Sequence, residues 1–170
     1  MNRYVVISIA QQRLTLWEIG ASNQSRQLAD YAVSTAQRGA GERQGSWQTP
    51  RGQHKIAQKI GDDLPERSVL RARQFTGEIL SMDAVQQHTD HDIVTSRIVW
   101  LTGCEPGVNL GGEVDTYERY IYIHGTNQEH LIGTPASHGC IRMKNKDIVS
   151  LFSLLDVGMP VTILEEPLLS

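Results

Sequence analysis

The stretch YVVISIAQQRLTLWEI, residues 4–19, is rich in Val, Ile, Leu, Tyr and Trp and is interrupted by the polar pair Gln11-Gln12. Such β-branched and aromatic residues favour strands, and a short polar break between two apolar runs is typical of a turn. The stretch therefore predicts a strand, a turn and a second strand. A third strand is expected over residues 27–34, after the turn-like residues 20–23, so the chain should begin as an antiparallel meander.

The rest of the chain continues mainly in strands. Further strands are predicted at residues 54–57, 77–81, 96–101, 117–123 and 160–164, and residues 36–52 form a glycine-containing loop. Residues 68–73 are expected to form a helical turn. The main helix is predicted over residues 146–157, where apolar residues recur with helical period, with Asn145 as its N-cap and Gly158 at its C-terminal end.

Length and composition describe an ordinary globular chain. With 170 residues we expect a single domain over residues 1–170, and a formal charge of −3 with 21% charged residues gives no polycationic face for nucleic acid. The longest N-terminal apolar stretch, residues 4–10, is interrupted by Ser8, so neither a membrane span nor a secretory leader is expected. A cytoplasmic protein with two reduced cysteines is the expectation, and the periplasm is the alternative if a leader was removed.

Two motifs carry the chemistry, namely IHGT at residues 123–126 and SHGCIR at residues 137–142. A thiol becomes a strong nucleophile when a nearby imidazole takes its proton, so Cys140 and His124 are the candidate nucleophile and base of an acyl transfer. Gly139 leaves room for a substrate carbonyl to approach the backbone. The amide hydrogens around Gly139 and Cys140 are therefore candidates for an oxyanion hole.

At these residues the chain resembles the YkuD-type L,D-transpeptidase catalytic domain family. That family's signature is an upstream His-Gly, followed by Ser/Thr-His-Gly-Cys, an apolar residue and Asn or Arg. TPRG at residues 49–52 extends the resemblance, which covers nearly the whole chain. The resemblance implies a mainly β fold, in which β-sandwich-like mixed sheets carry one main helix.

The resemblance also implies an activity on peptidoglycan stem peptides. The family's cysteine attacks the carbonyl that links the L-centre of meso-diaminopimelate to the terminal D-Ala of a tetrapeptide, which releases D-Ala and leaves a thioester. Hydrolysis of the thioester is L,D-carboxypeptidase activity, and attack by an amine gives an L,D-transpeptidase crosslink. The chain is similar to small leaderless members associated with carboxypeptidase work in peptidoglycan recycling, so we expect hydrolysis, with crosslinking as the alternative.

Roles for the individual residues follow from the same resemblance. It implies Cys140 and His124 as catalytic residues, with the Gly125 region supporting the base. Gly125, Ser137, His138 and Gly139 are expected in the oxyanion hole or pocket, which Arg142 also shapes. We further expect Tyr122, Thr126 and Arg142 in substrate binding. Arg142 is also a reasonable anchor for a substrate carboxylate through a bidentate pair. A carbapenem β-lactam is expected as a covalent inhibitor, and neither a cofactor nor a metal is expected.

Other interpretations apply to several of these residues. Zinc ligation by His124, His138 and Cys140, or by a site that includes the pair His88 and His91, matches no compact zinc framework. An inactive peptide-binding module is disfavoured because both catalytic candidates are present.

Residues without motif context have ordinary structural interpretations. Cys104 is expected in the core, and His54 and His130 at the surface. The run of Arg67, Arg71 and Arg73 is expected to be a solvated face, with contact to an acidic peptide as the alternative. The tryptophans Trp17, Trp47 and Trp100 are expected to pack on or cover the core.

Overall fold

The computed structural model describes residues 2–86 and 91–168 of the chain. Its first three strands, β1 (Asn2–Ser8), β2 (Arg13–Ile19) and β3 (Ser25–Ala32), form the antiparallel meander that the opening stretch predicts. Tyr4 of β1 pairs with Trp17 of β2, and the two rings stack with centroids 6.4 Å apart. The predicted turn at Gln11-Gln12 is confirmed, and Gln12 has a positive φ of 52° there.

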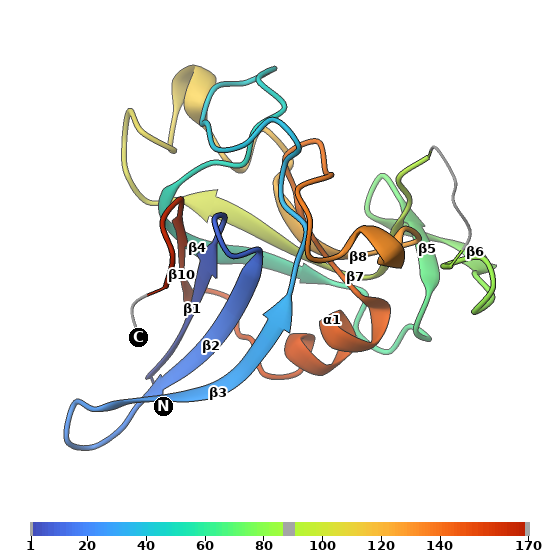
Figure 1. Ribbon diagram of the computed structural model, residues 1–170, viewed down its shortest axis with the longest axis horizontal. Coiled ribbons are helices and arrows are strands. Elements are labelled where there is room, and N and C mark those ends of the chain that lie inside the picture. The colour runs from blue at the N-terminus through green and yellow to red at the C-terminus, as the bar shows by residue number, and fades with distance from the viewer. Residues whose placement is uncertain (1, 87–90, 169–170) are drawn as a thin grey trace.

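The remaining elements alternate strands with short helices. They are β4 (Gly52–Ile60), β5 (Ser68–Arg71), β6 (Gln74–Ile79), β7 (Val94–Gly103), η1 (Gly112–Val114), β8 (Tyr122–Thr126), η2 (Glu129–Leu131), β9 (Ile141–Met143), α1 (Asn145–Phe152) and β10 (Pro160–Leu164). Within the described residues the strands run in the order β3-β2-β1-β10-β4-β7-β5-β6, and β8 and β9 branch from β7 (Figure 1). The β1–β10 and β8–β9 pairs are parallel and the other pairs are antiparallel. The predicted class, mainly β with a mixed sheet and one main helix, is confirmed.

The main core lies between the strands around β1, the strands β8 and β9, and the helix α1. It joins Val5 and Ile7 of β1 to Ile123 of β8, Ile141 of β9 and Ile148 of α1, all of which are fully buried. Apolar burial of this kind is the main source of stability. The sheet therefore folds onto itself as a sandwich-like layer pair, although its strands are hydrogen-bonded into one continuous sheet.

Two predicted elements differ in type from the structure. The segment 68–73 is a strand and turn rather than a helical turn, because Val69 and Leu70 pair with β7 and are buried. The predicted strand 117–123 begins only at Tyr122. Its first residues form a turn, in which Tyr120 has a φ of 57° and donates its N–H to Tyr117 O.

The helix is confirmed, but both of its predicted ends are wrong. The Asn145 side chain does not cap α1, because it points into the protein and hydrogen-bonds to Ser96 Oγ of β7 and to Thr126 O of β8. The helix ends at Phe152, six residues before Gly158. The chain then turns toward β4, where Gly158 N–H donates to Ile56 O and Ile56 N–H donates to Met159 O.

Within residues 2–86 and 91–168, no helix is long and apolar enough to cross a membrane.

Candidate active site

The strands β7, β8 and β9 have two faces of different character. Ile123 and Ile141 are register partners and face the main core. Because side chains alternate along a strand, Tyr122 and His124 lie on the opposite face. Cys140 directly precedes β9 and packs on that same face, against Tyr122. The parallel register thus places the candidate nucleophile and the candidate base on one surface.

His124 is held as a neutral base. Its side chain is 1% exposed, and Nδ1 lies 2.5 Å from Gly125 O. A carbonyl only accepts hydrogen bonds, so Nδ1 carries the proton and Nε2 presents a lone pair. Burial lowers the pKa of His124, although the nearby charge of Asp92 opposes this shift. The imidazole is therefore neutral near pH 7 and can accept a proton at Nε2.

Gly125 supports this base from its position in the sheet. A Cβ at Gly125 would lie 2.6 Å from Thr95 O and 2.8 Å from Asn145 Oδ1, so a larger residue does not fit without displacing β7 or α1. The residue is buried and supplies the carbonyl that orients His124. Its contact is therefore with the base that the Gly125 region is predicted to support, and its place in the pocket stays a prediction.

The Cys140 thiol is protonated at rest. It donates to Tyr120 O at 3.3 Å and accepts from Tyr122 N–H at 3.3 Å. Cys140 is partly exposed, and burial raises the pKa of its thiol to about 12. Within the described residues no hydrogen bond joins Cys140 Sγ to His124. A proton transfer to His124 therefore requires the thiol to leave the Tyr120 carbonyl.

The loop before Cys140 is fixed by hydroxyl groups. Ser137 Oγ donates to Cys140 O at 2.6 Å and accepts from Gly139 N–H at 3.2 Å, while Thr49 Oγ1 donates to Gly139 O at 2.9 Å. Gly139 has a φ of 134°, which only glycine adopts without strain. These contacts hold the backbone of the loop in one conformation.

These contacts leave fewer N–H donors for the predicted oxyanion hole. The Gly139 N–H is occupied by Ser137 Oγ, so its predicted role as a donor to an oxyanion is wrong. No residue in the described part of the chain accepts a hydrogen bond from the Cys140 N–H. The Cys140 amide is therefore the donor available to a developing oxyanion.

His138 lies at the surface, next to Trp47. The two rings meet edge to face, with centroids 5.0 Å apart and planes at 89°. They line a pocket of about 280 Å³ together with Gln37, Arg38 and Ser137. His138 therefore lines a surface pocket, and Cys140 is not among the residues that line it, so the predicted place of His138 in the pocket around the thiol stays a prediction.

Arg119 is a cation near the thiol that the sequence did not indicate. Its guanidinium donates to three main-chain oxygens and one hydroxyl, Gly41 O, Glu42 O, Gln48 O and Ser46 Oγ, at 2.6–3.3 Å. Its charge lowers the pKa of Cys140, against the larger effect of burial. No motif surrounds Arg119 in the sequence. Its position near the thiol is fixed by a loop that lies more than seventy residues earlier in the chain.

Arg142 and Thr126 do not meet a substrate in this geometry. Arg142 is 1% exposed, and its Nη1 lies 2.6 Å from Gln128 Oε1 and 3.1 Å from Asp92 Oδ1. Thr126 is fully buried and donates to the same Asp92 carboxylate at 3.2 Å. Their predicted roles in substrate binding are wrong, because both side chains build the interior network around Asp92. This network adjoins His124, and sequence patterns did not single out Asp92 as part of it.

Tyr122, the third residue predicted to bind substrate, lies beside the thiol. Its N–H donates to Cys140 Sγ, and its ring packs on Trp100 at 5.4 Å between centroids. Its phenol oxygen accepts from Arg73 Nη1 at 3.2 Å. Of the predicted substrate-binding residues, it is the one placed next to the reacting atom.

Other expectations are settled by burial. His54 is 1% exposed and Cys104 is exposed, so the predicted surface histidine is inside and the predicted core cysteine is outside. His54 is buried because its ring nitrogens contact Gly52 O at 3.0 Å and Thr116 Oγ1 at 2.9 Å. His130 is exposed, as predicted.

A zinc site that includes the histidines and Cys140 is the alternative interpretation. Among the described residues, no group of three or more His, Cys, Asp or Glu side chains is arranged to hold a metal ion. His88, half of the predicted histidine pair, lies outside the described residues.

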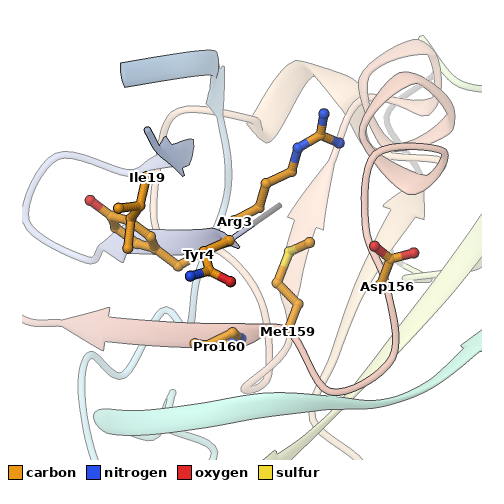
Figure 2. A pocket seen from close by; sticks show the side chains of 7 residues that line it. Arg3, Tyr4, Ile19, Asp156, Met159 and Pro160 are labelled. Carbon is orange, nitrogen blue, oxygen red and sulfur yellow. The ribbon is translucent and has the colours of Figure 1, made fainter. Parts of the chain in front are cut away.

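A separate pocket of about 340 Å³ lies near the N-terminus. Figure 2 shows Tyr4 and Ile19 close together, with Asp156 on the other side of the pocket. It is lined by Asn2, Arg3, Tyr4, Ile19, Asp156, Met159 and Pro160. None of these residues belongs to β8 or β9 or is a thiol or an imidazole, so the surroundings of Cys140 remain the candidate active site.

Known proteins resemble this chain in sequence and in fold. In sequence, the chain is similar to the probable L,D-transpeptidase YbiS of Escherichia coli (strain K12), with 46% identity over 109 residues. These residues make up 64% of this chain and 36% of YbiS, so the chain spans about a third of that relative's length.

Solved structures show the same fold. L,D-transpeptidase 3 from Mycobacterium tuberculosis, in complex with a faropenem-derived adduct, is 18% identical with a TM-score of 0.54 over 96% of this chain and 60% of that one. The L,D-transpeptidase LdtMt1 in complex with imipenem is 17% identical, also with a TM-score of 0.54, over 95% of this chain and 58% of that one. At these identities the likeness concerns the fold alone.

The decisive comparison covers the whole sheet and both motifs. Residues 2–163 match the family model YkuD, described as the L,D-transpeptidase catalytic domain. That range contains every described strand except the last residue of β10, together with the His124-Gly125 strand end and the loop that carries Cys140. The chain therefore belongs to the L,D-transpeptidase catalytic domain family, whose members act in peptidoglycan metabolism.

Proposed function

We propose that this chain is a cysteine-dependent L,D-carboxypeptidase that removes the terminal D-Ala from diaminopimelate-containing murein tetrapeptides in peptidoglycan recycling. Cys140 is the nucleophile and His124 is the base. The observation that carries the proposal is the neutral His124, whose Nδ1–H is held by Gly125 O, on the same face of β8 and β9 as Cys140. A base and a thiol in this relation support nucleophilic catalysis.

The first half of the reaction forms the thioester. The Cys140 thiol leaves Tyr120 O and gives its proton to His124 Nε2, and the sulfur attacks the carbonyl carbon at the L-centre of diaminopimelate. The Cys140 N–H stabilises the resulting oxyanion. When the intermediate collapses, the bond to the D-Ala nitrogen breaks, and His124 donates its proton to that leaving amine.

The second half of the reaction is hydrolysis. His124, neutral again, takes a proton from water as the water oxygen attacks the thioester carbonyl. The carbon–sulfur bond then breaks, the sulfur recovers a proton from His124, and the tripeptide leaves as a carboxylic acid. Tyr122 N–H and the charge of Arg119 support the thiolate in both halves, because each lowers the pKa of Cys140.

Attack by an amine on the same thioester is the alternative, and it would make the chain an L,D-transpeptidase. Aromatic side chains lie beside the thiol. Trp100 packs against Tyr122 and Tyr120, at 5.4 and 5.8 Å between centroids, and these rings form a wall beside Cys140.

One preparation tests the proposal and separates the alternatives. Pure protein is incubated with a diaminopimelate tetrapeptide, with and without a second stem peptide as amine donor, and the products are followed by mass spectrometry. We expect tripeptide and D-Ala in both mixtures. A crosslinked dimer in the second mixture would favour the transpeptidase.

Matched variants test the roles of the two thiols. Cys140→Ala should abolish both products, whereas Cys104→Ala, which removes the exposed thiol, should leave the rate unchanged. Turnover by Cys140→Ala that a chelator abolishes would replace the thiol mechanism with metal chemistry.

A carbapenem should acylate the same sulfur. The β-lactam carbonyl is attacked as the peptide carbonyl is, and opening of its ring leaves one covalent adduct per chain. Peptide mapping should place the adduct on Cys140. An adduct on Cys104 would contradict the assignment.

The cytoplasm is the proposed site of action, with the periplasm as the alternative. Cys104 is exposed and unpaired, which suits a reducing compartment. Cell fractionation with an antibody against the native protein tests this, and recovery in the periplasmic fraction would exclude a cytoplasmic role in recycling.

A further inference from the structure

Arg73 is held beside the candidate active site by aromatic rings. It lies in the turn between β5 and β6, where Ala72 and Arg73 both have positive φ, 48° and 66°. The side chain returns from this turn over the indole of Trp100, with Cζ 5.0 Å from the ring centroid, and over Tyr120 at 5.3 Å. These cation–π contacts fix the guanidinium without neutralising its charge.

Tyr122 connects this guanidinium to the thiol. Arg73 Nη1 donates to Tyr122 Oη at 3.2 Å, and the main chain of the same tyrosine donates to Cys140 Sγ at 3.3 Å. Tyr120 makes a second connection, since its ring lies under Arg73 and its carbonyl accepts from the thiol. One tyrosine residue and two hydrogen bonds therefore connect the guanidinium to the sulfur.

The positive charge of Arg73 lacks a counter-ion in the described part of the chain. Every other arginine that stands near the thiol is engaged: Arg142 pairs with Asp92, and Arg119 is surrounded by main-chain oxygens. By contrast, no described carboxylate lies within ion-pair distance of Arg73. A guanidinium has five N–H donors, and Tyr122 Oη uses one of them.

We propose that Arg73 is a specificity-determining residue that binds the C-terminal carboxylate of the D-amino acid to be released. This inference rests on the proposed carboxypeptidase function. In a substrate with one residue beyond the attacked carbonyl, the terminal carboxylate lies at most about 3.6 Å further along the chain. The free N–H groups of Arg73 can bind both oxygens of that carboxylate.

The chemistry makes the chain an exopeptidase for acid-terminated stems. A stem peptide that continues beyond D-Ala, or that ends in an amide, presents no carboxylate at this position. It also leaves the guanidinium without its partner while the substrate excludes water from it, which costs binding energy. Arg73 therefore distinguishes substrates by the residue that is released, and not by the diaminopimelate residue.

The test compares two substrates in several variants. The tetrapeptide with a free terminal carboxylate and the same peptide with a C-terminal amide are hydrolysed by wild type, Arg73→Met, Arg73→Lys and Arg71→Met. Arg71 is the matched control because it is exposed in the same hairpin. Wild type and Arg71→Met should prefer the acid by about 10- to 100-fold in kcat/KM, as expected for a charged hydrogen bond.

The preference of the Arg73 variants decides the proposal. In Arg73→Met the rate for the acid should fall to that for the amide, with the amide rate unchanged, and Arg73→Lys should recover part of the preference. If Arg73 only braced the aromatic wall, Arg73→Met would slow both substrates equally and preserve the preference. That result would overturn the proposal.

A binding measurement separates this proposal from the proposed function. If wild type released no D-Ala from the tetrapeptide, the carboxypeptidase function would fail. Titration calorimetry of both peptides against Cys140→Ala, with and without Arg73→Met, still measures recognition of the carboxylate. Tighter binding of the acid that disappears with Arg73→Met supports the role of Arg73, and equal binding of the two peptides contradicts it.

Discussion

At the scale of single residues, burial moves the pKa values of His124 and Cys140 in opposite directions. It lowers the pKa of the imidazole and raises that of the thiol to about 12, so both groups are neutral at rest. A preformed thiolate–imidazolium pair is disfavoured in this environment. The proton must therefore pass from Cys140 to His124 when the substrate binds. Arg119 and Arg142 favour this transfer, because their charges lower the pKa of the thiol.

The pH dependence of hydrolysis tests this view of His124. The base acts when neutral, and a group is neutral above its pKa, so kcat/KM should be lost as the pH falls through the pKa of His124. Since burial lowers that pKa from 6.5, the midpoint of the acid limb should lie below pH 6.5. The charge of Asp92 opposes the shift, so Asp92→Asn should move the midpoint lower still. A wild-type midpoint above 6.5 contradicts the assignment.

Arg119 should control the acidity of the thiol. Its charge lowers the pKa of Cys140, so Arg119→Met should raise that pKa and slow alkylation by iodoacetamide at pH 8, by about tenfold for each pKa unit of the change. The experiment is made in a Cys104→Ala background so that one thiol reacts. Arg119→Lys keeps the charge and should be slowed less; an equal effect of both variants would mean that the hydrogen bonds to residues 41–48 matter instead.

At the scale of elements, one buried amide joins the helix to the strands of the site. Asn145 Oδ1 accepts from the hydroxyls of Thr95 and Ser96, and its Nδ2 donates to Thr126 O and Glu129 Oε2 at 2.9 Å. The side chain therefore ties the first residue of α1 to β7, β8 and η2. This explains why a residue expected as a cap serves as a link between elements.

Removal of this link should destabilise the whole sheet. Asn145→Ala leaves two buried hydroxyls and a carbonyl with lost partners, at a cost of about 2–4 kcal/mol in the free energy of unfolding. Urea denaturation measures the change. Lys146→Ala, at the next and exposed position, is the control and should change stability by less than about 0.5 kcal/mol. Equal effects of the two variants would show that Asn145 contributes only helix propensity.

At the scale of the whole molecule, His54 couples stability to pH. This residue of β4 is buried against Thr116, and burial lowers its pKa from 6.5 to about 4. Between these values the unfolded chain binds a proton that the folded chain does not. Stability is therefore lost as the pH falls from 6.5 to 4, and it is unaffected by this group above 6.5.

The magnitude can be measured against a variant without the imidazole. The shift from 6.5 to about 4 corresponds to about 3 kcal/mol at pH 4. His54→Gln should be less stable than wild type at pH 7 and should lose about 3 kcal/mol less between pH 7 and pH 4, by urea unfolding. Parallel pH profiles for the two proteins would contradict a buried neutral His54.

The sequence determined the elements whose signals are local. The run at residues 4–19 specified a hairpin because its side chains alternate and break at one polar pair, and the apolar period after Asn145 specified the helix. The order His124-Gly125 and Ser137 to Cys140 identified the candidate chemistry for the same reason. Each of these patterns lies within a few consecutive residues.

The tertiary structure alone decided which charged groups surround the sulfur. Arg142, beside the thiol in sequence, is buried against Asp92, whereas Arg119 and Arg73 reach the site from a turn and a hairpin. Burial and pairing depend on segments far apart in the chain, so no local pattern separates a guanidinium that stabilises the interior from one that faces a substrate. The fold makes that choice by its strand register and by the carboxylates that it brings within reach of each arginine.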